Sequence, residues 1–503
     1  MSRYFFLLAI VALLFGCETV SNKVTNFMGG EDNAKPPTPL EDITQKVAIK
    51  KLWDKNTGSG TDEQYLKLVP VYHQNKLFVA DNDGEVSAID AATGKKIWER
   101  DTDSPITGGP GVGGSLVVVG TGKAEVIALS VDSGEIIWKT RVTSEVLASP
   151  RVSGNFVVVR TIDGKIFGLN VEDGKRIWVY DRAVPTLTLR GTSAPVIVDD
   201  FVIAGFDEGR LTEIELQTGK LVWETRIALG TGRSELDRMV DIDSEPVISD
   251  DTIYVATFQG RIAALSLVTG RILWTREISS YAGICVDDKA VYITDDDSAI
   301  WALDKNTGAS IWKQEKLVAR ALTAPESYGN MIAVGDLEGY VHWLNKDTGE
   351  IVARKQVADE KILAAPLAVD NIIYTYGSNG VLGAYTTDQL DIKTSVSDKP
   401  ADGADKPADG ADKPADGADK PADDADKPAD DADKPADDAV SHDEDMDNTS
   451  DQETAVQTED EEQQTAPPES PESDENTDTG EKGFWGKIFD KMLHDDEEDD
   501  NAN

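Results

Sequence analysis

The residue types that most often carry out chemistry are few in this chain and widely separated. Four His and two Cys occur among 503 residues. The histidines share no spacing typical of a metal site and stand at His73, His342, His442 and His494. Residues 109–114 match G-x-G-x-x-G by letter, but no helical pattern follows to present amide groups to a pyrophosphate. No Ser nucleophile elbow is present, and the acids at 295–297 are typical of a solvated turn. We therefore expect no enzyme activity, no metal and no cofactor.

The net charge is strongly negative and unevenly distributed. The formal net charge is −44 at pH 7, and much of the acid follows Asp398, where the heptads DKPADGA and DKPADDA repeat. This composition predicts disorder over residues 395–480, because too few apolar groups are present to offset chain entropy. A face that binds nucleic acid needs clustered Lys and Arg. No such cluster is visible, so no nucleic acid partner is expected.

Cys17 stands in a context that predicts covalent modification. An apolar run over residues 4–15 follows Arg3; it is shorter than the ~20 residues of a membrane span and is typical of a signal peptide over 1–16. Leu14-Phe15-Gly16-Cys17 resembles the lipobox of bacterial lipoproteins, which implies acylation of Cys17. Glu18 stands where inner-membrane lipoproteins carry Asp, which implies the outer membrane. Residues 17–46 would then be a tether. The alternative is an unmodified thiol in an ordinary signal sequence.

The elements that position these residues come from one repeated unit. The pattern T-G-x-x-x-W, or a close variant, ends at Trp in six places, with Gly in most copies 14 residues before it and Pro in most copies 28 residues before it. A seventh copy, Thr348-Gly349, ends at Ala353. Short β-rich apolar runs separate the turns, and no helical period is sustained before Asp398. Repeats of ~40 residues with four strands each are typical of β-propeller blades. Cys285 lies in one such strand pattern and is interpreted as a buried core thiol.

The two ends of the repeat region predict how the ring closes. Pro366 and Gly380 begin an eighth unit whose closing strand and Trp are missing. A spare strand lies at the other end of the region, at residues 48–53, and it ends in Trp53. We therefore predict an all-β fold, an eight-bladed β-propeller over residues 47–394. In it the N-terminal strand completes the last blade and removes two free sheet edges.

The repeated Trp residues are predicted to be structural. One Trp per blade at a constant position is what packing between blades requires. An aromatic platform for a ligand is the alternative interpretation. The residues concerned are Trp53, Trp98, Trp138, Trp178, Trp223, Trp274 and Trp312.

The blade motif resembles that of two known families. The pattern A-x-D-x-x-T-G-x-x-x-W is complete from Ala88 to Trp98 and from Ala302 to Trp312. It is similar to the motif of quinone-cofactor dehydrogenases and of the BamB family of outer-membrane assembly lipoproteins. Many of the dehydrogenases carry adjacent Cys residues over the cofactor, which two distant Cys cannot reproduce.

Two long joins between blades favour the BamB family. Pro195 stands 17 positions after Trp178, and Pro246 stands 23 positions after Trp223. These joins resemble the family segments L-T-L-R-G and S-E-[IL]-D-R-x-x-D-x-D. The resemblance implies that they bind the barrel-forming BamA subunit, with an exposed Leu pair and Arg in one join and an acidic pair in the other. The residues carried over are Leu187, Leu189, Arg190, Glu235, Asp237, Arg238, Asp241 and Asp243. Merely long, solvated loops are the alternative, but they leave Leu187, Leu189 and Met239 unexplained.

The chain ends in a short amphipathic segment. Apolar residues between Phe484 and Leu493 fall on one side of a helix, within a final segment at 481–503 that ends in acids. Such a segment would fold only against something else. A groove on another protein, the membrane interface and the chain's own propeller remain open as targets.

The sequence as a whole predicts a scaffold rather than an enzyme. The resemblance implies an outer-membrane lipoprotein facing the periplasm, in the Bam complex, that docks on the periplasmic repeats of BamA. Nascent outer-membrane proteins are further candidate partners. A periplasmic quinone-dependent dehydrogenase and a general periplasmic binding propeller are the two alternatives.

Overall fold

The computed structural model describes residues 35–389, except 186, 188, 190–192 and 232. Several expectations therefore lie outside the described residues: the signal peptide, Cys17, Arg190, the acidic tail and the final amphipathic segment. Among the described residues, no helix is long and apolar enough to cross a membrane.

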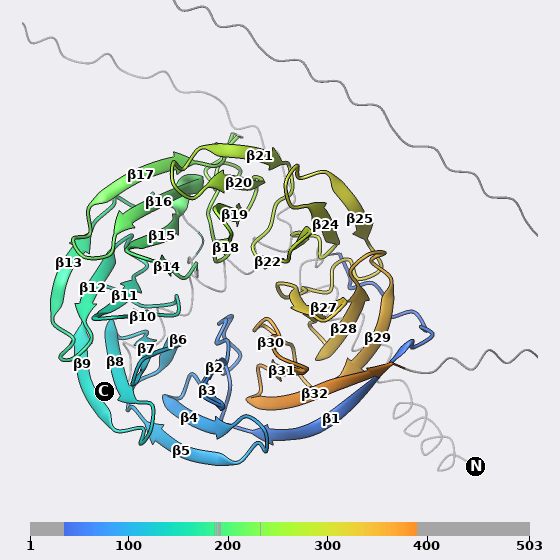
Figure 1. Ribbon diagram of the computed structural model, residues 1–503, viewed down its shortest axis with the longest axis horizontal. Helices are drawn as coiled ribbons and strands as arrows, with labels where there is room; N and C mark the ends of the chain where they lie inside the picture. Colours follow the sequence, from blue (N-terminus) through green and yellow to red (C-terminus); the bar gives the residue numbers. More distant parts are fainter. Residues whose placement is uncertain (1–34, 186, 188, 190–192, 232, 390–503) are drawn as a thin grey trace, which may run out of the picture. The chain divides into compact units, whose positions relative to one another are not determined.

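Eight four-stranded antiparallel sheets follow one another around a ring (Figure 1). Blade 1 contains β2 (Val71–His73), β3 (Lys76–Ala80), β4 (Glu85–Asp90) and β5 (Lys96–Asp101); blade 2 contains β6 (Ile106–Gly113), β7 (Leu116–Thr121), β8 (Glu125–Ser130) and β9 (Ile136–Arg141). Blade 3 contains β10 (Arg151–Ser153), β11 (Phe156–Arg160), β12 (Ile166–Asn170) and β13 (Arg176–Tyr180); blade 4 contains β14 (Val196–Val198), β15 (Phe201–Phe206), the 3-10 turn η1 (Asp207–Gly209), β16 (Arg210–Glu215) and β17 (Leu221–Arg226).

The second half of the ring repeats this order. Blade 5 contains β18 (Val247–Ser249), β19 (Thr252–Ala256), β20 (Ile262–Ser266) and β21 (Ile272–Arg276); blade 6 contains β22 (Gly283–Val286), β23 (Ala290–Thr294), β24 (Ile300–Asp304) and β25 (Ser310–Gln314). Blade 7 contains β26 (Glu326–Tyr328), β27 (Met331–Gly335), β28 (Tyr340–Asn345) and β29 (Ile351–Gln356); blade 8 contains β30 (Leu367–Val369), β31 (Ile372–Tyr376), β32 (Val381–Gln389) and β1 (Val47–Asn56).

The N-terminal strand closes the ring. β1 pairs antiparallel with β32, from Val47 opposite Gln389 to Asn56 opposite Val381. The predicted fold, an eight-bladed propeller completed by its N-terminal strand, is therefore confirmed.

The Gly-rich segment and Cys285, both noted from the sequence, lie in strands of the ring. Residues 109–113 of the G-x-G-x-x-G segment lie in β6, and Cys285 is a buried thiol in β22.

Each repeated Trp packs against the T-G turn of the next blade. A Cβ on Gly134, at φ +67°, would stand 2.5 Å from the ring of Trp98 in the preceding blade. The Nε1–H of Trp98 also donates to the carbonyl of Val131, at 2.9 Å. Glycine is needed at this position because the turn takes a positive φ and the indole lies directly over it. The same arrangement links Trp53 to Gly94 across the ring closure.

The seventh copy of the motif lacks its Trp for a structural reason. Ala353 lies in β29, and the next blade is blade 8, whose outer strand β1 comes from the other end of the chain. Within the described residues, no T-G hairpin therefore joins the last two strands of blade 8, and a Trp at position 353 would have no glycine to cover. Trp343, opposite Ala353 in β28, is fully buried there.

Every outer strand carries a β-bulge at one repeated position. In β5, Ala88 pairs with Trp98 and Ile89 with Lys96, so Ile97 is skipped. The equivalent skipped residues are Leu52, Ile137, Ile177, Val222, Leu273, Ile311 and Val352. Bulges at sheet edges hinder edge-to-edge pairing between molecules. They give this ring blunted outer edges.

Candidate partner-binding site

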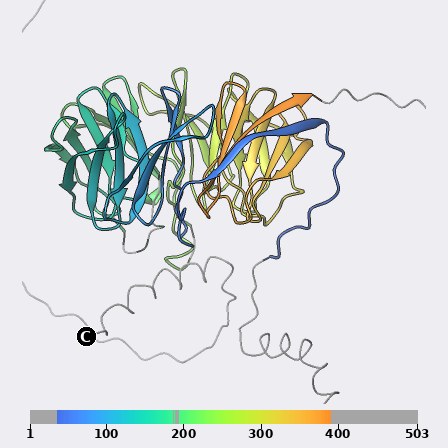
Figure 2. The same cartoon turned by 90° about the horizontal axis from the view of Figure 1, so that it is seen from below.

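The joins that connect one blade to the next lie on one face of the ring. They run from the outer strand of one blade to the inner strand of the following one, on the face opposite the T-G turns. We call this side the join face. The long joins are the β13–β14 join, the β17–β18 join and the β1–β2 join. Figure 2 shows blue and green loops, the colours of the β1–β2 and β17–β18 joins, projecting below the ring.

An apolar cluster brings the two joins of interest together. Leu187 and Leu189, from the β13–β14 join, pack against Met239 of the β17–β18 join. Phe258 and Tyr281 complete the cluster, and their rings meet edge to face with centroids 6.5 Å apart. The Leu pair was expected to be exposed, and that expectation is wrong. Both side chains are half-buried, because Met239 and the two aromatic rings cover part of each.

Asp241 fastens these joins through backbone hydrogen bonds. One carboxyl oxygen accepts from the N–H of Leu189 at 2.7 Å, and the other accepts from the N–H of Glu208 at 3.2 Å. The residue is 2% exposed. Burial raises its pKa to about 8, and the nearby charges of Asp243 and Asp207 add to the rise. Asp241 therefore positions the loops and is closed to direct contact with a partner.

Asp243 lies deeper in the same cluster of charges. It is 6% exposed, and burial raises its pKa to about 6, although the charges of Lys67 and Arg160 oppose this. Arg160 in turn lies 3.9 Å from Asp207. The sequence predicted an acidic pair in this join as a partner contact, and the structure shows that Asp241 and Asp243 are both buried. Their carboxyl groups point into the protein, where backbone N–H groups and cations surround them.

Lys67 connects a third join to the site. It belongs to the β1–β2 join, and its Nζ donates to the carbonyl of Tyr281 at 2.7 Å, in the β21–β22 join. The same ammonium lies 6.0 Å from the centre of the Tyr281 ring. Burial lowers the pKa of Lys67, whereas the Asp243 charge raises it. This hydrogen bond therefore connects the β1–β2 join to the β21–β22 join.

The tip of the β17–β18 join is the exposed part of the site. Glu235, Asp237 and Arg238 are all exposed, and Arg238 forms an ion pair with Glu235. Asp237 accepts from the N–H of Ser234 at 3.1 Å, and such hydrogen bonds lower its pKa. Leu236, between them, is 43% exposed. An apolar side chain presented by an ordered, polar turn is typical of a protein-binding surface.

The sequence alone did not single out several residues of this site. Lys67, Phe258 and Tyr281 come from other joins and hairpins, and Leu229 and Leu236 are exposed residues of the β17–β18 join. A motif search finds residues near one another along the chain, whereas Lys67 and Tyr281 are 214 positions apart. One feature of the sequence could have pointed to Lys67. The β1–β2 join, which contains it, is as long as the β13–β14 join when both are counted from Trp to Pro.

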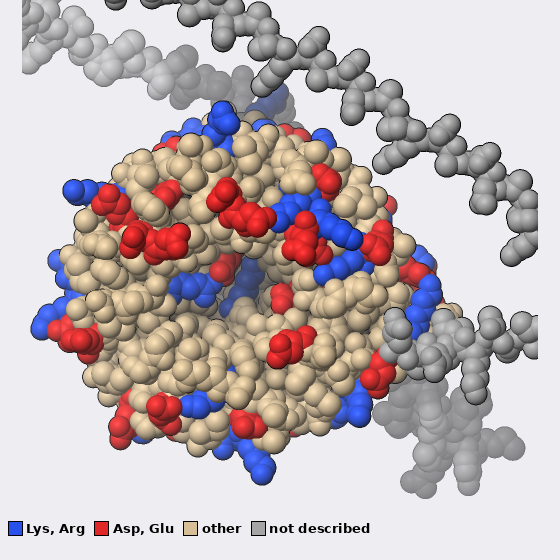
Figure 3. Space-filling model, viewed as in Figure 1, with Lys and Arg blue, Asp and Glu red and all other residues tan. Residues whose placement is uncertain are grey.

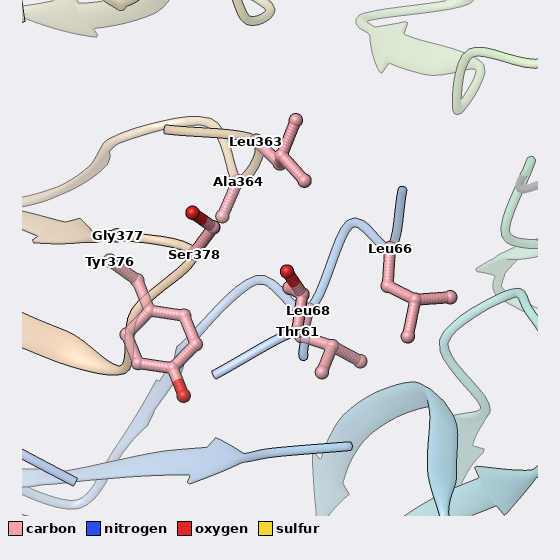
Figure 4. A pocket seen from close by; sticks show the side chains of 8 residues that line it. All are labelled: Thr61, Leu66, Leu68, Leu363, Ala364, Tyr376, Gly377 and Ser378. Carbon is pink, nitrogen blue, oxygen red and sulfur yellow. The ribbon is translucent and has the colours of Figure 1, made fainter. Parts of the chain in front are cut away.

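One pocket in the described part of the chain has a small volume. A pocket of about 150 Å³ lies between the β1–β2 join and the β31–β32 hairpin, with Leu66, Leu68 and Tyr376 among its lining residues (Figure 4). Cofactor pockets usually enclose roughly 300–1,000 Å³, so this one is too small. Figure 3 shows the ring hollowed at its centre, with acidic and basic side chains around the opening. Among the described residues, no three His, Cys, Asp or Glu side chains are grouped as metal ligands.

Comparisons with known proteins find a family model and similar proteins that carry the same description. A family model described as outer membrane protein assembly factor BamB matches residues 50–107 and 82–314. The chain is 46% identical to the protein of that name from Pseudomonas aeruginosa over 380 residues, which cover 76% of this chain and 97% of the relative. It is 43% identical to the one from Legionella pneumophila, over 75% of this chain and 97% of that protein.

Solved structures agree with the fold. The crystal structure of BamB from Moraxella catarrhalis superposes with a TM-score of 0.62 at 30% identity, covering 67% of this chain and all of that one. A quinohemoprotein alcohol dehydrogenase from Pseudomonas putida superposes with a TM-score of 0.56 at 13% identity, over 72% of this chain and 78% of that one. The second likeness shows a shared propeller fold and nothing more.

Proposed function

The chain belongs to the family of the outer membrane protein assembly factor BamB, and from that membership we propose that it is a non-enzymatic scaffold of the outer-membrane β-barrel assembly (Bam) complex. Its work would be to dock on the periplasmic repeats of the BamA subunit and so aid the assembly and insertion of outer-membrane proteins. The single observation that carries the docking site is the fastening of the two long joins by Asp241.

The proposed contact differs from the one expected from the sequence, in which a Leu pair with an Arg and an acidic pair would all touch the partner. The half-buried Leu187 and Leu189 and the exposed Leu236 would supply apolar area, and Arg238 and Glu235 would supply polar contacts at the rim. Arg190 remains part of the proposal on the ground of its sequence motif. Asp241 and Asp243 would act indirectly, because they hold the joins in the shape that the partner meets.

We propose that the protein is anchored by lipid at Cys17 and faces the periplasm from the outer membrane. The lipobox pattern at residues 14–17 supports this, and so does the outer-membrane role named for the relatives. An anchored scaffold raises the local concentration of its partner, so that individually weak contacts suffice.

Dehydrogenase activity has weaker support. The quinohemoprotein dehydrogenase neighbours are 13–14% identical to this chain, whereas the assembly factors reach 46%. We therefore propose for this chain the role of the assembly factors and not that of the dehydrogenases.

Co-purification from detergent-solubilised envelopes tests the docking site. We expect a Leu187→Ala, Leu189→Ala, Leu236→Ala variant to recover BamA at about one tenth of the wild-type level or less, because three apolar contacts are shortened. Arg190→Ala should weaken recovery without changing the melting temperature of the propeller.

The matched control shortens exposed aliphatic side chains elsewhere. Ile137 and Leu273 are 48% and 50% exposed on the outer wall. An Ile137→Ala, Leu273→Ala variant should recover BamA normally. Unchanged recovery with the triple variant, or equal loss with the control, would refute the proposed contact.

A further inference from the structure

Residues 35–46, which were expected to belong to a loose tether, lie along the outer wall of blades 6 and 7. We call this segment the strap. Figure 1 shows it beside β29, ahead of β1. Leu40 and Ile43 of the strap pack against the core that contains Leu317, Leu322 and Ile351. The strap therefore packs against a core that two blades share.

A buried guanidinium group receives the strap. Arg320, in the β25–β26 join, is 1% exposed, and its Nε donates to Asp336 at 2.8 Å. Its Nη2 pairs with Glu338, and its Nη1 donates to the carbonyl of Thr38 at 3.0 Å. The N–H of Thr38 returns a hydrogen bond to the carbonyl of Val318, at 3.1 Å. A buried cation needs every donor satisfied, and one of these partners comes from the strap.

A second arginine holds the other half of the strap. Nη1 of Arg354 donates to the carbonyl of Glu41 at 2.9 Å, and Nε2 of Gln45 donates to the carbonyl of Arg354 at 3.2 Å. The N–H of Lys46 then donates to the carbonyl of Val352 at 2.8 Å, along the edge of β29. Val352 is the bulge residue of its blade, and it is 5% exposed where its seven equivalents are 41–51% exposed. Val47 and Ile49 of β1 pack against the cluster that contains Val352. The start of β1 and Lys46 of the strap therefore cover together an edge that other blades leave open.

The composition of the strap lowers the cost of ordering it. Three prolines, at 36, 37 and 39, restrict its first half to extended backbone before it binds. Polar contacts at the two ends then fix its direction. Lys35 lies 3.3 Å from Asp297 at one end, and Lys46 lies 2.5 Å from Glu350 at the other.

These end contacts lie on opposite faces of the ring. Asp297 belongs to the β23–β24 hairpin on the join face, whereas Glu350 ends the T-G turn between β28 and β29. The strap therefore crosses the full wall, and Figure 2 shows it descending from the start of β1 to the side where the long joins project. Without the strap, the chain would enter the ring at Val47, on the T-G face.

We propose that the strap is an orienting clamp, which makes the segment leading to the Cys17 anchor leave the ring on the join face. This rests on the proposed lipid anchor. The join face, with its docking site, is thereby turned toward the membrane that holds the anchor. Lys35 stands 18 positions after Cys17, and an extended chain of that length spans at most about 65 Å. Release of the strap would move the exit to the other face and lengthen this reach to about 108 Å, for 30 residues.

Hydrogen exchange of the full-length protein tests the clamp itself. In wild type, the amides of Thr38 and Lys46 should be protected. A Leu40→Ala, Ile43→Ala variant should exchange these amides about tenfold faster or more, because the shortened side chains lose their packing against the core. The matched control is Ile137→Ala, Leu273→Ala, which changes exposed positions on the same outer wall and should leave strap exchange unchanged. Unprotected strap amides in wild type would overturn the proposal.

Energy transfer to a bilayer tests the orientation. The lipidated protein is placed in vesicles of phosphatidylethanolamine and phosphatidylglycerol that contain an acceptor lipid. Donor dyes are attached at Lys123→Cys, in the β7–β8 hairpin on the join face, or at Glu135→Cys, in the T-G turn of the same blade. The join-face label should transfer more strongly in wild type, and the strap variant should lose this difference.

The possible outcomes separate the clamp from the anchor. A protein that stays bound to the vesicles but shows equal transfer from both labels refutes the clamp and leaves the anchor intact. A protein that does not bind the vesicles refutes the anchor and the orientation together. Protection of Thr38 and Lys46 can still be measured in that case.

Discussion

At the scale of single residues, Asp241 illustrates how a buried carboxyl group can organise a binding surface without touching the partner. Its two oxygens accept hydrogen bonds from Leu189 and Glu208, in two different segments. In the sequence it is one acid in a polar join, and such acids are usually solvated. Its burial follows from the folding of the joins over one another, which no local pattern encodes.

Replacing Asp241 with Asn should loosen the joins. An amide offers one acceptor where the carboxyl group offers two, so one N–H donor loses its partner, at a cost of about 1–3 kcal/mol. The amides of Leu189 and Glu208 should then exchange hydrogen faster. Asp237→Asn, at an exposed position of the same join, is the control and should leave exchange at Leu189 and Glu208 unchanged.

The same side chain should make stability depend on pH. The folded pKa of about 8 lies above the ordinary value of 3.8, so the folded state holds the proton more tightly between these values. Asp241 therefore contributes stability at low pH that is lost as the pH rises toward 8. Denaturant unfolding from pH 5 to 8 should show a smaller decline with pH in Asp241→Asn than in wild type. An equal decline would mean that the carboxyl group is already ionised.

His342 should act in the opposite direction. It is fully buried, its Nε2 lies 2.8 Å from Asp336, and its Nδ1 accepts from Nε of Arg354 at 3.1 Å. Burial lowers its pKa from 6.5; the Asp336 carboxylate opposes this, whereas the Arg354 and Arg320 charges add to it. The unfolded state is then protonated first, so stability is lost as the pH falls below 6.5. His342→Gln, whose amide can donate and accept, should reduce this loss when unfolding is compared at pH 7 and pH 5.5.

At the scale of the strand, the outer member of each blade combines a contact with the next blade and protection of its own edge. In β9, Trp138 lies over Gly174 of the next blade, and its Nε1 donates to the carbonyl of Val171 at 2.9 Å. The neighbouring bulge residue, Ile137, is 48% exposed. Of these two adjacent residues, Trp138 should therefore contribute much more to the free energy of unfolding than Ile137.

This difference predicts the result of a pair of substitutions. Trp138→Ala should destabilise the propeller by about 3–5 kcal/mol, because it leaves a cavity between blades 2 and 3. Ile137→Ala should change the free energy of unfolding by about 0.5 kcal/mol or less, since its side chain is largely exposed. The midpoint of urea unfolding measures both. Similar midpoints for the two variants would contradict the packing role of the Trp.

The strands and their order were predictable because they repeat. Constant spacing of Pro, Gly and Trp revealed the blades, and an unmatched strand ending in Trp53 revealed the closure. The strap was not predictable, because its Pro-rich composition is also that of a linker and its partner Arg320 lies 282 positions from Thr38. The family motif located the two long joins, but it did not reveal which of their side chains face inward. That depends on contacts with Phe258, Tyr281 and Lys67 from other joins.

At the scale of the whole propeller, the ring is held shut by pairing between strands from its two ends. The first strand, β1, is joined to blade 8 through its ladder with β32. Its continuation toward the N-terminus is the strap, which is bound to blade 7. Outward movement of β1 would therefore break the ladder, the contact of Trp53 with Gly94 and the strap together. We predict that these contacts are lost cooperatively and that the closure is the first part of the ring to open in unfolding.

A disulfide across the closure should therefore stabilise the ring. Lys50 and Thr386 are antiparallel partners in the β1–β32 ladder, and partners of this kind lie roughly 4.5–5.5 Å apart, within the range of a disulfide. In Lys50→Cys, Thr386→Cys the bond would close a loop of more than 300 residues, which restricts the unfolded chain and blocks the opening step. We expect slower unfolding and a melting temperature raised by a few degrees, both reversed by a reductant.

The comparison that identifies the closure as the weak point is a disulfide placed within one blade. Thr252 and Ser266 are partners in the β19–β20 hairpin, and Thr252→Cys, Ser266→Cys would close a short loop far from β1. This second bond should leave the unfolding rate near that of wild type, because the hairpin opens only after the ring has opened. Cys285 is buried and should not exchange with either bond. If both disulfides slow unfolding equally, the ring does not open first at β1, and the closure has no special place in unfolding.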